Sequence, residues 1–382
     1  MNYTEIKGLS IDIINALNTQ SVTQMTPIQQ EVYRFISDNR DVVACSSTGS
    51  GKTLAYLVPV INKLDLESKH IQALILVPTQ ELAIQVHEQI MKLFENAHIG
   101  LFSQFLIGDG NINRQVETLK NKPAIVVGTP SRVNQLIKLK KLRVHDVKTL
   151  VIDEADKLMD KTYYEAVMAI RKSLMKFTQV LLFSASIDKK TRICAESLTF
   201  KAVTIDISKT NSNESIIPKT IKHIFIVADR RERIETMRKI AKASKSNKTM
   251  VFINTKYDLE ESLQKLEYHH YNVAALSGNQ DKFEKKKALD GFKAGSIQYL
   301  LATDVAARGL QIDDVETVIN VNLPEDSKEY LHRAGRCGRN GKSGLCISII
   351  TENELNKIKK YQKDFHINIV QKRLYQGKIV AK

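Results

Sequence analysis

Residues 42–60 read VVACSSTGSGKTLAYLVPV and join a short apolar run, a turn of small residues and a helix-like segment. The run VVAC is typical of a buried strand, and the segment that begins at Lys52 is helix-like. Between them, Gly49 and Gly51 allow the backbone to turn tightly and to point its N–H groups at one bound anion. A strand, a glycine-rich turn and a helix in this order predict a phosphate-binding loop.

The side chains after the glycines suit a nucleotide with a bound metal ion. Lys52 would reach the β- and γ-phosphates, and the hydroxyl of Thr53 would bind Mg²⁺. The first loop position is Ser46 where the strict pattern has glycine, so a glycine- and serine-rich turn before a helix is the structural alternative. The nucleotide-binding residues expected from this loop are Ser47, Thr48, Gly49, Ser50, Gly51, Lys52 and Thr53.

A pair of carboxylates follows another apolar run, in residues 150–156, which read LVIDEAD. Asp153 suits a ligand of Mg²⁺, and Glu154 beside it suits a general base that polarises an attacking water. Two adjacent acids at the end of a strand are also typical of a solvated edge. With a phosphate loop earlier in the chain, the pair favours nucleotide hydrolysis.

Three arginines and two glycines lie within residues 332–339, which read HRAGRCGR. Rigid guanidinium groups are suited to several phosphate oxygens, and an arginine can stabilise the charge of a γ-phosphoryl group in transfer. The alternative is a basic, exposed helix end. If these arginines meet the nucleotide, then ATP lies between two domains and hydrolysis requires their closure.

Short apolar runs alternate with amphipathic segments along the chain, whose 382 residues predict two domains rather than one. The polar segment 208–220 interrupts this alternation and is interpreted as a linker. We therefore predict an α/β fold with two tandem doubly wound parallel-sheet domains, 1–207 and 221–382, joined by a flexible linker. The strand-like runs are 42–45, 73–78, 124–129, 149–153 and 180–186, then 223–228, 249–254, 272–278, 297–304, 317–324 and 344–351.

The composition indicates the class of chain and a possible kind of partner, and it does not define the function. Lys and Arg total 57 against 42 Asp and Glu, a net charge of +15 that fits either a polyanionic partner or a charged surface. The content of 43% hydrophobic and 26% charged residues excludes a disordered or collagen-like chain. Neither a membrane helix nor a secretory signal is expected, and the scattered cysteines predict no zinc site, no disulfides and a reducing, cytoplasmic compartment.

In order and spacing, these motifs resemble those of the DEAD-box ATP-dependent RNA helicases over nearly the whole chain. Residues 153–156 spell the name motif of that family. Any single tetrapeptide is weak evidence, whereas roughly nine motifs in the order of the family make coincidence negligible. The other similar segments are TPIQ (26–29), PTQELA (78–83), TPSR (129–132), SAS (184–186), VFINT (251–255), TDVAARGL (303–310) and HRAGRCGR (332–339).

The resemblance implies two RecA-like domains that use ATP and Mg²⁺ and act on RNA. It implies that Gln29 reads the adenine edge, that Gly309 and Gln311 lie at the nucleotide, and that Arg336 and Arg339 contact the γ-phosphate. The RNA contacts that it implies are Pro78, Thr79, Gly108, Thr129, Pro130, Arg132, Asn254, Thr255, Lys282, Lys285 and Thr303. The residues that it implies in coupling hydrolysis to strand separation are Ser184, Ala185, Ser186, Asp156 and His332.

Several residues depart from the family pattern. Gln311 replaces an acid that bonds the ribose, although a neutral amide still bonds hydroxyls. Lys282 and Lys285 replace a Gln-x-x-Arg motif, which keeps the charge and loses a bidentate fork. Ser186 replaces a threonine. These changes affect the expected efficiency of unwinding more than the binding of ATP and RNA.

The two ends of the chain leave alternatives open. The family has an aromatic residue upstream of the Gln29 motif, near adenine, and Tyr3 and Ile6 are the candidates here. The basic end 371–382 reads QKRLYQGKIVAK, and it either adds affinity for phosphate or is a solvating chain end. The short flanks resemble those of small, core-only bacterial members, for which ribosome assembly and RNA turnover are the usual settings.

The expected partner is single-stranded or short duplex RNA, including ribosomal precursor particles, bound by a monomer. The RNA motifs contain Thr, Pro, Gly and Arg rather than aromatic residues, which argues against base stacking and for a grip on the backbone with little sequence specificity. The leading hypothesis is an RNA-stimulated ATPase that locally separates short duplexes. The alternatives are an ATP-gated RNA clamp or annealing factor and a DNA-directed motor, which the RNA-family motifs disfavour.

Overall fold

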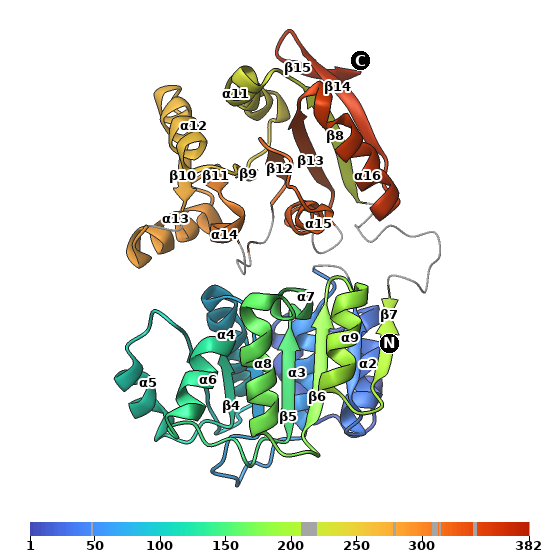
Figure 1. Ribbon diagram of the computed structural model, residues 1–382, viewed down its shortest axis with the longest axis vertical. Coiled ribbons are helices and arrows are strands. Elements are labelled where there is room, and N and C mark those ends of the chain that lie inside the picture. Colours follow the sequence, from blue (N-terminus) through green and yellow to red (C-terminus); the bar gives the residue numbers. More distant parts are fainter. Residues whose placement is uncertain are drawn as a thin grey trace. The chain divides into compact units, whose positions relative to one another are not determined.

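The computed structural model describes residues 1–46, 49–207, 220–277, 280–307, 312, 315–338 and 342–381, with the backbone alone at residues 190, 282, 305 and 328. The chain divides into two compact units, Met1–Asn211 and Ser212–Lys382 (Figure 1). Of the predicted linker, only Thr220 falls within the described ranges. The domain boundaries that the sequence suggests therefore remain predictions.

The first unit is built on a parallel sheet with the strand order β3-β4-β2-β5-β6-β1-β7. Its central strands are buried along their whole length, as continuous apolar runs in a parallel sheet require. The strands are β1 (Val42–Cys45), β2 (Ala73–Leu76), β3 (Ser103–Leu106), β4 (Ile125–Gly128), β5 (Thr149–Asp153), β6 (Gln179–Ser184) and β7 (Val203–Asp206).

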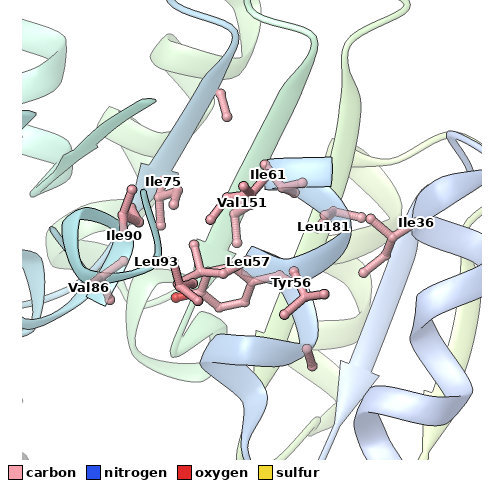
Figure 2. Packing of buried hydrophobic residues seen from close by; sticks show 14 of the residues in the cluster. Ile36, Tyr56, Leu57, Ile61, Ile75, Val86, Ile90, Leu93, Val151 and Leu181 are labelled. Carbon is pink, nitrogen blue, oxygen red and sulfur yellow. The ribbon is translucent and has the colours of Figure 1, made fainter. Parts of the chain in front are cut away.

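Helices cover both faces of this sheet and form one apolar core on each side. In the first core, Tyr56 and Leu57 of α3 lie against Ile75, Val151 and Leu181 of three neighbouring strands (Figure 2). The second core lies beneath α6 to α9. The helices are α1 (Ile11–Thr19), α2 (Pro27–Ser37), α3 (Lys52–Asn62), α4 (Gln80–Asn96), α5 (Ile112–Leu119), α6 (Pro130–Lys138), α7 (Ala155–Leu158), α8 (Lys161–Ser173) and α9 (Lys189–Leu198), with a 3-10 turn η1 (Tyr3–Glu5).

The second unit repeats this architecture with the strand order β10-β11-β9-β12-β13-β8-β14-β15. Its pairs are parallel except for β14 and β15, which form an antiparallel hairpin at one edge. The strands are β8 (Ile221–Val227), β9 (Thr249–Phe252), β10 (Val273–Leu276), β11 (Tyr299–Ala302), β12 (Thr317–Asn320), β13 (Gly344–Ile350), β14 (Ile369–Tyr375) and β15 (Lys378–Ala381). The helices are α11 (Arg233–Ser244), α12 (Lys256–Tyr268), α13 (Lys282–Ala294), α14 (Asp304–Ala307), α15 (Ser327–Ala334) and α16 (Leu355–Phe365), with 3-10 turns η2 (Arg230–Glu232) and η4 (Glu352–Glu354).

The predicted fold class is confirmed, because both units are α/β with sheets that are parallel or almost so. The predicted apolar runs all contain strands, whereas β3, β7, β14 and β15 had no such signal. The basic end of the chain pairs as the β14–β15 hairpin and extends the sheet. Among the helices that the structure describes, none is both long and apolar enough to cross a membrane.

Candidate active site

Three neighbouring strands bring three of the predicted motifs to one edge of the first sheet. Strand β6 pairs in parallel with both β1 and β5, so that Ser184 lies opposite Cys45, and Phe183 lies opposite Asp153. The backbone N–H of Ser46 continues this register with a 3.1 Å hydrogen bond to the carbonyl of Ser184. The phosphate loop, the carboxylate pair and the SAS segment therefore start side by side, although they are far apart in the sequence.

The described part of the phosphate loop has the conformation that its glycines permit. Gly49 and Gly51 have φ angles of +79° and +88°, in the left-handed region that favours glycine. A Cβ atom on Gly51 would lie 2.6 Å from Nε2 of Gln29, so a side chain there would displace the amide of Gln29. The Nζ of Lys52 donates a 2.7 Å hydrogen bond across the loop to the carbonyl of Ser46. The predicted residues 47 and 48 lie outside the described ranges.

Lys52 is a buried cation with carboxylates nearby. Burial lowers the pKa of its ammonium group, and the nearby carboxylates of Asp153, Asp156 and Glu154 oppose that effect. A cation held in a partly buried loop among fixed dipoles is pre-organised to bind charge that develops on a phosphoryl group. The geometry thus agrees with the phosphate-binding role that the sequence suggests for Lys52.

The carboxylate of Asp153 is buried and held in one orientation. Its Oδ2 accepts a 2.9 Å hydrogen bond from the hydroxyl of Tyr56, and its Oδ1 accepts a 2.8 Å bond from the N–H of Glu154. Burial and the neighbouring charge of Glu154 raise the pKa of Asp153 to about 6, against the effect of Lys52. Thr53 lies one helical turn before Tyr56 in α3, so the two predicted metal ligands belong to the same part of the site.

The donor set at this place fits Mg²⁺. A hydroxyl from Thr53 and a carboxylate from Asp153 are the hard oxygen ligands that this ion prefers. Within the described residues, no three His, Cys, Asp or Glu side chains gather into a metal-binding group. Mg²⁺ nevertheless needs only one or two protein ligands when phosphates and waters complete its octahedron. These two side chains would hold the ion together with a nucleotide.

Glu154 occupies a strained turn between β5 and α7. Its φ and ψ angles of 52° and 49° are left-handed, a conformation that is uncommon for a residue other than glycine. Residues in this conformation cluster at functional sites, and they also end helices, as Lys245 and His366 do in this chain. Its carboxylate Oε2 accepts a 2.8 Å hydrogen bond from Nζ of Lys157. The backbone thus turns sharply just where the sequence places the general base.

Gln29 connects three separate parts of the first domain. Its Oε1 accepts hydrogen bonds of 2.8 Å from both the Tyr3 hydroxyl and the N–H of Thr26, and its Nε2 donates to the carbonyl of Gly51 at 3.1 Å. Gln29 is only 3% exposed. Tyr3 and Ile6, the candidates for the upstream aromatic position, both lie in the domain core, and Tyr3 reaches Gln29 through its hydroxyl.

The carboxylate motif and the SAS segment are joined by one hydroxyl. The Oγ of Ser184 lies 2.8 Å from Oδ1 of Asp156 and 2.7 Å from the carbonyl of Ser186, and it accepts from the N–H of Asp156 at 3.2 Å. The carbonyl of Ala185 accepts a bond from the thiol of Cys45. The Oγ of Ser186 is buried and has no hydrogen-bond partner among the described atoms.

The predicted RNA contacts of the first domain lie at the ends of β2, β3 and β4. Thr79 is the N-cap of α4, where its hydroxyl accepts from the N–H of Leu82 at 3.2 Å. The guanidinium of Arg132 donates to the carbonyl of Gly108 and, at 3.0 Å, to that of Gly110. Arg132 therefore organises the 108–110 turn, and its role as an RNA contact stays a prediction. Pro78, Thr129 and Pro130 immediately precede or begin helices at the same edge.

Arg333 is a residue whose role sequence reasoning missed. Its side chain is 1% exposed, donates twice to the carboxylate of Asp304 at 2.7 and 2.6 Å, and stacks over the ring of Phe252. It also donates to the carbonyl of Asn322 at 2.7 Å and to Oδ1 of Asn254 at 2.9 Å. It thus joins three segments that resemble motifs of the family: VFINT (251–255), TDVAARGL (303–310) and HRAGRCGR (332–339). The sequence shows three arginines here and no signal that separates this buried one from the others.

The remaining predicted residues of the second domain lie near helix termini. His332 is in α15, and Arg336 lies in the turn that follows it. Thr255 is the N-cap of α12, and Thr303 accepts from the N–H of Ala306 just before α14. Lys285 lies in α13. Gly309, Gln311 and Arg339 fall outside the described residues, as does the side chain of Lys282.

This fold and site define a P-loop ATPase with two RecA-like domains. The comparisons with known proteins agree, since residues 26–193 match the DEAD/DEAH box helicase family and residues 232–341 match the helicase conserved C-terminal domain. The chain belongs to the DEAD-box ATP-dependent RNA helicases, which are RNA-stimulated ATPases. The predicted family, the enzyme class and the use of ATP are thereby confirmed.

Two bacterial relatives are similar over almost their full lengths. The chain is 35% identical to the DEAD-box ATP-dependent RNA helicase CshC of Bacillus cereus over 375 residues, which are 98% of this chain and 94% of the relative. It is 36% identical to the probable ATP-dependent RNA helicase YfmL of Bacillus subtilis over 365 residues, which are 96% and 95% of the two chains.

A solved structure shows the same architecture. The structure of S. cerevisiae Dbp5 bound to RNA and ADP BeF3 has a TM-score of 0.86 and 26% sequence identity to this chain. The similarity covers 96% of this chain and 94% of the Dbp5 chain in that structure. The likeness therefore extends across both RecA-like domains and not only across the nucleotide site.

Proposed function

We propose that this helicase couples ATP hydrolysis to closure of its two domains and to local separation of short RNA duplexes. The observation that supports the proposal is the hydroxyl of Ser184, which lies 2.8 Å from the carboxylate of Asp156. This contact links helix α7, whose N-cap is the proposed base Glu154, to the SAS segment. A change at the bound nucleotide can therefore be transmitted from α7 to strand β6 through the side chain of Ser184.

Each residue of the site has a proposed role in hydrolysis. Lys52 and the loop amides hold the phosphates, Thr53 and Asp153 hold Mg²⁺, and Glu154 accepts a proton from the attacking water. Bound ATP and Mg²⁺ would supply the transferable phosphoryl group and a Lewis acid. In the closed enzyme, Arg336 and Arg339 stabilise the charge on the γ-phosphoryl oxygens. The left-handed backbone conformation of Glu154 supports its assignment as the general base.

RNA is proposed to bind through its backbone. The net charge of +15 supports this proposal, as do the hydroxyl and amide groups at the ends of β2, β4 and β9. Contacts to phosphates carry no sequence information, so the enzyme would bind single-stranded or short duplex RNA with little sequence preference. We further propose that it acts as a monomer in the cytoplasm, in ribosome assembly or RNA turnover, by analogy with small bacterial members of the family.

A second candidate is an ATP-gated RNA clamp with weak unwinding. The buried Oγ of Ser186 lacks a hydrogen-bond partner in the described part of the chain, at the position where the family has threonine. A loosely anchored SAS segment would transmit less of the energy of hydrolysis. Gln311, at the position where the family has an acid that bonds the ribose, adds a further departure from the family pattern.

Steady-state ATPase assays with and without RNA, run beside strand displacement on a short duplex, test these proposals. The helicase proposal predicts that RNA stimulates ATP hydrolysis and that displacement of a duplex strand requires ATP. Stimulated hydrolysis without displacement would favour the clamp, and hydrolysis that ignores RNA would contradict both. A steep fall in RNA affinity with added salt is expected if phosphate contacts dominate, and a flat response would exclude a backbone grip.

A further inference from the structure

Tyr56 places a phenol at a core position that a plain aromatic ring could fill. The residue belongs to α3 and is 0% exposed. Its ring packs in the first core, where its centroid lies 5.2 Å from that of Phe183. A buried hydroxyl costs free energy unless it is hydrogen-bonded, whereas the ring of a phenylalanine carries no polar atom. The partner of the hydroxyl is therefore what distinguishes tyrosine from phenylalanine here.

That partner is a carboxylate of the nucleotide site. The hydroxyl of Tyr56 donates a 2.9 Å hydrogen bond to Oδ2 of Asp153. Phe183 of β6 lies opposite Asp153 of β5 in the parallel register, and residues paired in this way point to the same face of a sheet. The ring that packs against Phe183 is thus placed to bring its hydroxyl to the neighbouring strand position, which Asp153 occupies.

A side-chain carboxylate differs from a backbone acceptor in what a hydrogen bond does to it. Tyr361, also buried, donates to a backbone carbonyl, which the main chain already fixes. The terminal torsion of an aspartate is broad, so its carboxylate can turn unless hydrogen bonds hold it. The N–H of Glu154 holds Oδ1 of Asp153 at 2.8 Å, and the hydroxyl of Tyr56 holds Oδ2. Both oxygens keep acceptor capacity for a further partner.

The same hydrogen bond joins the helix of one proposed metal ligand to the strand of the other. Thr53 lies one turn before Tyr56 in α3, and Lys52 is the first residue of that helix. The contact with Asp153 therefore ties the helix that follows the phosphate loop to the end of β5. Residues that touch a metal ligand rather than the metal orient that ligand, and their loss commonly weakens metal binding by about 10- to 100-fold.

We propose that Tyr56 is a positioning residue for Mg²⁺, which acts by holding the carboxylate of Asp153 in the orientation that the ion requires. The inference rests on the proposed function, which assigns Mg²⁺ to Thr53 and Asp153. It adds Tyr56 to the residues on which binding of the ion depends. Tyr56→Phe keeps the ring and its packing and removes only the oxygen, so this variant isolates the hydrogen bond.

Binding of a fluorescent, non-hydrolysable ATP analogue to the full chain tests the proposal. The Kd in EDTA divided by the Kd in Mg²⁺ gives the gain in affinity that the ion provides. Tyr56→Phe should lower this ratio about 10-fold and leave the Kd in EDTA unchanged. The Mg²⁺ concentration that gives half the maximal ATPase rate should rise by a similar factor. Tyr361→Phe is the matched control, because it removes a buried hydroxyl from the second domain and should leave the ratio unchanged.

Asp153→Asn, alone and combined with Tyr56→Phe, shows whether Tyr56 acts through Asp153. The asparagine should lower the ratio at least as far, and adding Tyr56→Phe should lower it no further. An unchanged ratio in Tyr56→Phe would overturn the proposal, whether or not the overall affinity falls, as would a double variant in which the two single losses multiply. A wild-type ratio near 1, or an unchanged ratio in Asp153→Asn, would instead contradict the proposed metal site, and this inference with it.

Discussion

The hydroxyl of Tyr3 donates a 2.8 Å hydrogen bond to Oε1 of Gln29, whose Nε2 donates in turn to the carbonyl of Gly51. The third residue of the chain is thereby linked through one side chain to the end of the phosphate loop. Burial raises the pKa of Tyr3, so that the phenol stays protonated and remains a donor. Hydrogen bonds within the protein fix the amide of Gln29 without any contribution from a nucleotide. A fixed amide is what the recognition of a base edge requires.

Tyr3→Phe should raise the KM for ATP and leave the kcat nearly unchanged. The ring still fills the core, while Gln29 loses one of its three hydrogen bonds and becomes less ordered. A hydrogen bond worth about 1 kcal/mol corresponds to a rise in KM of about 5-fold. Steady-state ATPase kinetics measure this, with Tyr33→Phe in α2 as the control. Equal KM values in the two variants would exclude Tyr3 from nucleotide binding.

Glu154→Gln should retain ATP and RNA but lose turnover. The amide keeps the shape of the side chain and cannot accept a proton, so kcat should fall by about 100-fold or more. Equilibrium binding of a fluorescent ATP analogue and single-turnover hydrolysis measure the two properties separately. Glu165→Gln, an exposed substitution on α8, provides the control. Turnover at the wild-type rate would remove Glu154 from the mechanism.

Ser184→Ala should uncouple strand separation from hydrolysis. The change removes the hydroxyl that contacts Asp156 and leaves the strand pairing of β6 intact. We expect the number of duplexes displaced per ATP hydrolysed to fall about 5-fold or more, the lower end of typical coupling energies. Ser197→Ala, whose hydroxyl bonds only a carbonyl of its own helix and a methionine sulfur, is the control. Equal losses of hydrolysis and displacement would show that the contact is not a coupling element.

The second domain should lose stability in mild acid because of His223. The imidazole lies in the core with its Nδ1 2.9 Å from the hydroxyl of Tyr330, and burial lowers its pKa to about 4. Between the unfolded value of about 6.5 and pH 4, the unfolded chain binds the proton and the folded chain does not. The free energy of unfolding is therefore highest above pH 6.5 and falls as the pH drops through that window.

Chemical denaturation of the full chain at pH 7 and pH 5 measures this effect. The loss at His223 should be about 2 kcal/mol, and His223→Gln should lack it. His270→Gln, at an exposed position, should behave as the wild type does. A pH dependence that survives in His223→Gln would assign the effect to other groups.

Arg333→Met should destabilise the second domain strongly. It leaves the carboxylate of Asp304 and the carbonyl of Asn322 without their buried guanidinium partner. Removing one member of a buried ion pair costs about 3 to 5 kcal/mol, which lowers the Tm of a domain of this size by about 10 °C. Differential scanning calorimetry of the full chain measures the shift. Arg238→Met, which breaks only a surface pair with Glu235, should shift the Tm far less.

Most of the strands and the order of the motifs could be predicted from the sequence because their signals are local. Runs such as LVI, in residues 150–152, are apolar throughout, since both faces of a parallel sheet are covered. Strand β3 had no such signal, because it begins with Ser103 and Gln104, and these polar residues are buried through hydrogen bonds with other chain segments. Strands β14 and β15 lie at an edge of the sheet and contain Gln371, Lys372, Arg373 and Lys378, so in the sequence they resemble a basic chain end.

The residues that carry the chemistry of the site are consecutive within each motif. They are the loop that ends in Lys52 and Thr53, and the pair of Asp153 and Glu154. Such groups can be read from the chain because each motif supplies its own backbone and side chains. Tertiary structure alone decided which side chains are partners and which are exposed. In the folded protein, Arg132 and Arg333 point inward and bond carbonyl and carboxylate oxygens. Gln29 accepts a hydrogen bond from Tyr3, while Tyr257 and Phe283 are exposed. Burial and hydrogen bonding between distant segments depend on how strands pair and helices pack, and no spacing along the chain records them.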